Sequence, residues 1–208
     1  MDVREYLTAD GKNPYRQWLD TLDVTPRARI QARVLRFSTG NLGDRKSVGG
    51  GVWEARVMFR SGYRIYFGKD GQELVLLLLG GDKSTRRQMW RVHRRRGRPI
   101  RRTNAVARRS EDWNVGLAED LRNPPFAREF LLAAIDEGVD IQVALGKVIR
   151  AMGVKEFAAK VRMASPNVLR AINPRHNPTQ ATLDRLLKPF GLRLSLAPLR
   201  GKSRQTAA

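Results

Sequence analysis

Four side chains in the first part of the sequence could act together on a phosphate group. Arg56 and Arg64 are fork-shaped, permanently charged cations, so the two together can hold a phosphate and stabilise charge that develops on its oxygens. Lys83, in a Gly-Gly-containing segment, could add a third positive charge or transfer a proton. Glu54 could act as a base or simply pair with Arg56. These residue types suit metal-independent RNA cleavage, because the 2′-hydroxyl of RNA is itself the nucleophile.

The elements that would position these side chains can be predicted from apolar patterning. Three strand-like runs lie at residues 52–59, 63–67 and 74–79, and the last is apolar on both faces, which is typical of a central strand. Two amphipathic helices precede them and start at Asn13-Pro14 and Thr25-Pro26, each an N-cap residue followed by proline. The pattern predicts a small α+β domain in which two helices pack on one face of an antiparallel sheet.

The register of the first two strands decides which side chains meet. A three-residue hairpin loop pairs residues whose numbers sum to 122, which sets Arg56 against Tyr66 and Met58 against Arg64. Because side chains alternate along a strand, Glu54 shares a polar face with these residues, and the opposite face is apolar. Any solvated sheet surface is also polar, so alternation alone does not distinguish a catalytic face from a merely exposed one.

The charge of the chain is concentrated in one segment. The 208 residues carry 40 Lys and Arg against 20 Asp and Glu, a net charge of +20, and residues 86–110 contain 11 arginines and no acidic residue. We interpret this segment as a linker between two modules, with a nucleic-acid-contacting arm as the alternative. The basic balance predicts a polyanionic partner. Residues 198–208 are expected to form a disordered basic tail.

Composition also limits cofactors and location. With no cysteine and two histidines, the chain lacks the usual transition-metal ligands, and we expect no metal and no cofactor. No apolar run approaches the about 20 residues that a bilayer requires, and the N-terminus lacks an apolar signal core. We therefore expect a cytoplasmic protein without a membrane partner.

The second part of the sequence, residues 111–197, has the pattern of a helix-turn-helix. Residues 154–161 predict a short helix, residues 162–164 a turn, and Ser165-Pro166 the start of a second helix that ends at Ile172. In such a motif the second helix enters the major groove of DNA by its N-terminal end. A pair of short helices can also be only a packing unit without a DNA partner.

The second helix divides into expected core positions and expected DNA contacts. Val168, Leu169 and Ile172 could supply the core. Asparagine suits adenine, and arginine suits guanine or phosphate. The residues left for DNA are Ser165, Asn167 and Arg170 on the helix and Arg175 in the loop that follows.

Five ordered blocks in residues 1–85 resemble the phage-derived HigB-like branch of the RelE toxin superfamily. They are YLTADGKNP at 6–14, GNLGD at 40–44, GVWEARV at 51–57, GYRIYF at 62–67 and LLLGGDKS at 77–84. The resemblance implies a small α+β fold that cleaves mRNA, commonly on the translating ribosome. It would give that role to Arg56, Arg64 and Lys83, with Lys46 and Tyr66 as RNA contacts.

The sequence departs from that family after residue 85. Relatives usually continue into a C-terminal helix, whereas this chain enters the arginine-rich stretch. We interpret residues 86 to about 102 as an out-of-frame or remodelled version of that helix, produced when two adjacent genes became one. On this interpretation the toxin half lacks a supporting element, which would weaken or abolish its activity.

Residues 111–197 resemble the HigA-like addiction-module antidote proteins. The resemblance rests on LAEDLRNP at 117–124, GV at 153–154, NPT at 177–179 and FGLRL at 190–194. It implies a helix-turn-helix antitoxin that binds its toxin and represses its own operon. The expected architecture is therefore a RelE-like α+β domain followed by an all-α helix-turn-helix domain.

The two resemblances together imply a fused type II toxin-antitoxin protein. Within one chain a short flexible linker would give the antitoxin half a high effective concentration, so we expect it to mask the toxin half. The expected partners of the chain are mRNA on the ribosome, operator DNA and the other half of the toxin-antitoxin pair, within one chain or between chains. A homodimer is the form that a two-fold operator would favour. One alternative is a non-enzymatic DNA-binding regulator whose toxin fold serves for docking or dimerisation. Another is a general nucleic-acid binder driven by the arginine stretch.

Overall fold

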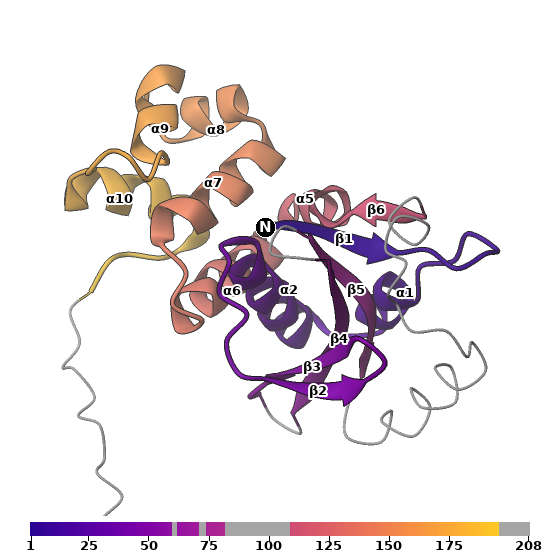
Figure 1. Cartoon of the computed structure of the whole chain (residues 1–208). Coiled ribbons are helices and arrows are strands. Elements are labelled where there is room, and N and C mark those ends of the chain that lie inside the picture. The colour runs from indigo at the N-terminus through magenta and orange to yellow at the C-terminus, as the bar shows by residue number, and fades with distance from the viewer. Residues whose placement is uncertain (60–61, 71–73, 82–108, 196–208) are drawn as a thin grey trace, which may run out of the picture.

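A computed structural model describes residues 1–59, 62–70, 74–81 and 109–195 (Figure 1). Lys83, most of the arginine-rich stretch at 86–110 and the tail at 198–208 lie outside the described residues. The first half, residues 1–81, contains β1 (Asp2–Tyr6), α1 (Pro14–Asp20), α2 (Val24–Ser38), β2 (Arg45–Gly49), β3 (Val52–Val57), β4 (Tyr63–Asp70) and β5 (Leu74–Gly81). The second half, residues 109–195, contains β6 (Ser110–Asp112), α5 (Trp113–Leu121), α6 (Pro124–Asp136), α7 (Ile141–Met152), α8 (Val154–Lys160), α9 (Ser165–Ala171), α10 (Gln180–Leu187) and the short 3-10 helix η1 (Lys188–Phe190).

Helix starts follow the capping signals of the sequence. The Asn13 side chain accepts from the backbone N–H of Arg16 at 2.9 Å and caps α1, as its Asn-Pro pair predicts. Helix α2 begins at Val24, earlier than predicted, with Asp23 as its N-cap. Pro26 fits there because the first N–H groups of a helix have no intrahelical partner, so proline is tolerated throughout the first turn.

The sheet is mixed rather than antiparallel. Its strand order is β2-β3-β4-β5-β1-β6, and β1 pairs with β5 in parallel while the other neighbouring strands pair antiparallel. The prediction of a wholly antiparallel sheet is therefore wrong at β1. Strand β5 lies between β4 and β1, which confirms its predicted central place. The fold is thus mixed α and β, in agreement with the predicted α+β class.

The β3–β4 register differs from the prediction by two residues. Paired residue numbers sum to 120, so Arg56 lies opposite Arg64 and Glu54 opposite Tyr66. The cause is an early bend: the Phe59 N–H donates to the Val57 carbonyl at 3.0 Å, so β3 ends before Met58. Because side chains alternate with a period of two, this shift leaves every side chain on its predicted face.

Helices cover one face of the sheet in two layers. Helices α1 and α2 pack on the sheet, and α6 lies along α2 on the outer side (Figure 1). The buried apolar residues form one large cluster that includes Phe67 of the sheet, Phe37 of α2, Phe130 of α6 and Phe157 of α8. The second half also supplies β6, which pairs with β1 at the edge of the sheet. The two halves therefore share one core and one sheet.

Two short helices, α8 and α9, lie where the sequence predicts a helix pair, and residues 161–164 separate them. Val168 and Ile172 are buried as predicted, at 0% and 1% exposure. The prediction that Leu169 belongs to the core is wrong, because its side chain is 44% exposed. Ala171 supplies the inward contact instead, at 5% exposure. The buried face of α9 follows the helical period through residues 168, 171 and 172, and residue 169 lies outside it.

Candidate functional site

Five of the six residues predicted from the first half share one face of the sheet. Lys46, Glu54 and Tyr66 lie opposite one another across β2, β3 and β4. Arg56 and Arg64 form the neighbouring cross-strand pair, two residues further along. The sixth residue, Lys83, lies outside the described part of the chain. We call these five residues, 46, 54, 56, 64 and 66, the polar sheet face.

Glu54 is the centre of the polar sheet face. Its side chain is buried, and its Oε1 lies 3.2 Å from Arg64 Nε and 3.6 Å from Arg56 Nε. Of the two roles considered for Glu54, pairing is therefore observed, and it involves both arginines rather than Arg56 alone. Glu54 Oε2 is buried and has no hydrogen-bond partner among the described residues. One carboxylate thus holds two guanidinium groups together, and its second oxygen keeps its capacity to accept a hydrogen bond.

Exposure varies strongly across the polar sheet face. Lys46 is exposed and the Arg56 side chain is 52% exposed, whereas the Arg64 side chain is 14% exposed. Tyr66 is buried together with Val52, against a small apolar cluster. A simple solvated surface would expose all of these groups. Burial of a carboxylate instead requires compensating partners, which the two arginines provide.

The second half presents its predicted DNA contacts on α9 and the loop that follows. Ser165 is partly buried at the start of α9, and Asn167 and Arg170 are exposed on the same helix, three residues apart. Arg175 is exposed in the loop after α9. Leu169 is exposed beside these residues, so the helix offers an apolar contact that the prediction assigned to the core.

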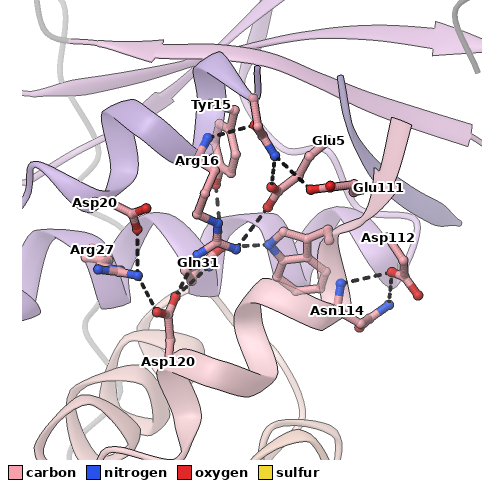
Figure 2. Close-up of polar contacts among 12 residues, drawn as sticks. Glu5, Tyr15, Arg16, Asp20, Arg27, Gln31, Glu111, Asp112, Asn114 and Asp120 are labelled. Atoms are coloured by element: carbon pink, nitrogen blue, oxygen red, sulfur yellow. Dashed lines mark hydrogen bonds and ion pairs between the residues drawn. The ribbon is translucent and has the colours of Figure 1, made fainter. Parts of the chain in front are cut away.

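A polar network at the junction of the two halves was not predicted from the sequence. Asp120 of α5 accepts hydrogen bonds from Arg16 of α1 and Gln31 of α2, each at 3.1 Å, and also pairs with Arg27 of α2 (Figure 2). Arg16 also donates to Glu5 of β1 at 3.0 Å. Asp120 and Arg27 are far apart in sequence, so no local pattern could have indicated their contact.

Two residues of α5 adapt it to this junction. The Trp113 indole N–H donates to Gln31 Oε1 at 2.6 Å, and Trp113 is fully buried. A Cβ atom on Gly116 would lie 1.8 Å from Arg16 Nη2, so the glycine leaves space for the arginine. A glycine inside a helix normally costs about 1 kcal/mol relative to alanine. The presence of Gly116 inside α5 is therefore the one sequence signal that could have indicated a close contact between α5 and another part of the chain.

A second set of ion pairs joins α2 to the end of α6. Glu137 accepts from Arg33 at 2.8 Å and from Arg36 at 3.2 Å, and Asp136 lies 3.2 Å from Arg29. Acidic side chains of the second half thus face basic side chains of the first. These contacts lie on the helical side of the sheet, so they do not cover the polar sheet face.

Burial perturbs one carboxyl group in this network. Burial raises the pKa of Glu5, and the nearby Arg16 guanidinium and the hydrogen bond from Asn13 oppose that effect. Asn13 Nδ2 lies 2.6 Å from Glu5 Oε2. The group is one of few acidic side chains in the described first half that are almost fully buried. Its environment is that of a structural junction rather than of a solvent-accessible catalytic cleft.

Among residues 1–59, 62–70, 74–81 and 109–195, no helix has both the length and the apolar character needed to cross a bilayer. In the same ranges, no three histidine, aspartate or glutamate side chains gather in a way that could hold a metal ion.

One relative of known sequence matches part of the chain. A protein of Haemophilus influenzae, described only as uncharacterized, is 44% identical over 86 residues. The match covers 41% of this chain and 81% of the Haemophilus protein. The chain belongs to the same family as this protein. No protein-family model and no solved structure matches the chain. Family membership therefore brings no activity with it, and the functional argument rests on the residues themselves.

Proposed function

We propose that the chain is a fused toxin-antitoxin protein, in which the polar sheet face acts on mRNA at the ribosome and α9 binds operator DNA. The observation that carries this proposal is the contact of Arg56 and Arg64 with one buried carboxylate, that of Glu54, with Lys46 opposite Glu54 on the same sheet face. Three cations within two neighbouring cross-strand rows match the charge of an RNA backbone. The resemblance of residues 1–85 to HigB-like toxins supports the same assignment.

The geometry supports specific roles in RNA cleavage. Arg56 and Arg64 would bind the scissile phosphate and stabilise charge that develops on its oxygens. Glu54 would hold both guanidinium groups in place. Because its Oε2 is buried, the carboxylate takes a positioning role rather than direct contact with the 2′-hydroxyl. Lys46 would contact the neighbouring backbone. In the part of the chain that the structure describes, the second half contacts the first on the helical side of the sheet and at the β1 edge, so the expected masking of the toxin half would not act by covering the polar sheet face.

The proposal can be tested with the full chain in a reconstituted translation reaction, with primer extension to detect cuts in the mRNA. We expect Arg56→Ala/Arg64→Ala to reduce cleavage by at least about 100-fold, as removal of one transition-state contact commonly does. The matched control is Arg128→Ala/Arg185→Ala, which removes two exposed arginines of α6 and α10. Equal cleavage by both double variants would refute the assignment of the arginine pair.

The DNA half of the proposal rests on the exposed residues of α9. We expect Asn167→Ala and Arg170→Ala each to weaken binding to a cognate duplex by about 1–3 kcal/mol and to relax its sequence preference. Fluorescence anisotropy with cognate and scrambled duplexes would measure both effects. If neither substitution changes the ratio of the two affinities, α9 is not the helix that reads the sequence.

The structure of the junction favours one second candidate, a non-enzymatic DNA-binding regulator. The two halves share one hydrophobic cluster, and β6 of the second half completes the sheet of the first. A first half built into the core in this way would suit a docking or dimerisation platform. This candidate predicts full binding of cognate DNA by the chain and no mRNA cleavage by it.

A further inference from the structure

A buried amide ties α7 to the end of the α9 segment. Gln142, the second residue of α7, is 8% exposed. The two hydrogens of its Nε2 are shared among three backbone carbonyl oxygens: those of Ala171 at 2.8 Å, Asn173 at 2.9 Å and His176 at 3.0 Å. All three acceptors lie at the end of α9 or in the loop that follows it. A single side chain therefore fixes the course of the chain where it leaves α9.

The position of Gln142 is itself well defined. Asp140 caps α7 by accepting from the backbone N–H of Gln142 at 2.7 Å. An apolar side chain at position 142 would leave three carbonyl groups without this donor, and unpaired buried polar groups are costly. The need to satisfy these carbonyl groups therefore explains why a polar amide, rather than an apolar side chain, is buried at position 142.

The loop held by Gln142 carries a predicted DNA contact. Arg175 and His176 are exposed, while the backbone N–H of Arg175 donates to Asn173 Oδ1 at 3.0 Å and that of His176 to the Asn173 carbonyl at 2.9 Å. The carbonyl groups of residues 173 and 176 are engaged by the buried amide. These two carbonyl groups therefore point toward Gln142 in the protein interior. The Arg175 side chain is exposed to solvent on the same loop.

We propose that Gln142 is a positioning residue for DNA binding. It holds the loop after α9 so that Arg175 meets the phosphate backbone when α9 enters the major groove. Phosphate contacts set the orientation of a recognition helix on the duplex, so a loop of fixed geometry makes the base contacts of α9 reproducible. The inference rests on the proposed DNA-binding function and assigns Gln142 no contact with DNA itself.

The test is a double-mutant cycle in the full chain between Gln142→Glu and Arg175→Ala. The glutamate keeps the shape of the side chain but removes both amide hydrogens and places a carboxylate against the three carbonyl groups. Gln17→Glu, at an exposed position on α1, is the control with the same change of charge. The probe is a labelled duplex made from the DNA immediately upstream of the coding sequence, with unlabelled random duplex as competitor.

Arg175→Ala is expected to weaken DNA binding. It should also make the negative slope of log affinity against log salt concentration shallower by about one, because one phosphate contact is lost. Gln142→Glu is expected to produce the same change of slope, and the double variant to bind no more weakly than Arg175→Ala within about twofold. Gln17→Glu should leave the slope unchanged. Losses that add in the double variant, or a Gln142→Glu protein with an unchanged salt slope, would overturn the inference.

Circular dichroism and thermal melting establish that every variant in the cycle is folded. Gln142→Met replaces Gln142→Glu if the latter does not fold. In either folded variant, faster hydrogen exchange of the Arg175 and His176 amides is expected, and unchanged exchange would count against the inference. If the wild-type chain does not bind the duplex, the DNA-binding function fails and the inference with it. Wild-type binding with additive losses defeats the inference alone.

Discussion

At the scale of single residues, the polar sheet face depends on Glu54, because its buried carboxylate contacts both Arg56 and Arg64. The three side chains lie on one sheet face as alternation predicts, even though the register differs by two residues. The burial of Glu54 and its contact with both arginines could not be predicted, because they depend on which strands flank β3.

Gly116→Ala should destabilise the protein, against the usual trend. In most helix interiors this change stabilises by roughly 1 kcal/mol. Here the new Cβ would lie 1.8 Å from Arg16 Nη2 and displace a guanidinium that pairs with Glu5 and Asp120. Urea denaturation should show a lower midpoint for the variant. A higher midpoint would mean that the contact between Arg16 and α5 contributes little.

Glu5→Gln should remove one component of the dependence of stability on pH. Because burial raises the pKa of Glu5 above its usual 4.5, the folded protein binds this proton more tightly than the unfolded chain does. The contribution of Glu5 is thus fully present below pH 4.5 and is lost as pH rises through the raised pKa. The free energy of unfolding of Glu5→Gln minus that of wild type should therefore increase with pH in that window. A difference that stays flat or decreases there would contradict the perturbed pKa.

At the scale of elements, helices with capping signals were predictable and short polar strands were not. Asn13 caps α1 as predicted, and Asn123 and Thr179 cap α6 and α10 through the same kind of side-chain hydrogen bond, because a cap is a local signal in the sequence. Strands β1, β2 and β6 were missed, since each is short and rich in charged or polar residues. Their pairing depends on partners distant in sequence, which apolar alternation does not reveal. The junction of α5 and α6 with α2 is hidden for the same reason.

Asp120→Ala should weaken this junction, by about 3 kcal/mol in the free energy of unfolding, because it removes the carboxylate that the partly buried Arg16 and Arg27 share. The Asp120 side chain is 7% exposed. Asp136→Ala is the matched control, since Asp136 pairs with Arg29 across the same junction but is 60% exposed. Its effect should lie within about 1 kcal/mol. Chemical denaturation of both variants measures the difference, and equal effects would show that Asp120 is no more important than a surface ion pair.

At the scale of the whole molecule, net charge is a poor guide to where nucleic acid binds. More than half of the +20 charge lies in residues 86–110, whereas the proposed RNA contacts are three basic residues on one sheet face, two of them paired with Glu54. The proposed DNA contacts lie on α9, and the junction occupies the helical side of the sheet (Figure 1). The molecule thus separates the polar sheet face, the junction and α9 in space. The three can be altered one at a time.

The most direct test of the central claim is the cleavage of mRNA by the purified full chain, measured with and without translating ribosomes. The account predicts cuts by the wild-type chain when ribosomes translate the message, and loss of those cuts in Arg56→Ala/Arg64→Ala. It is contradicted if the wild-type chain binds its cognate DNA and leaves the translated mRNA intact, the result that the regulator without enzymatic activity predicts.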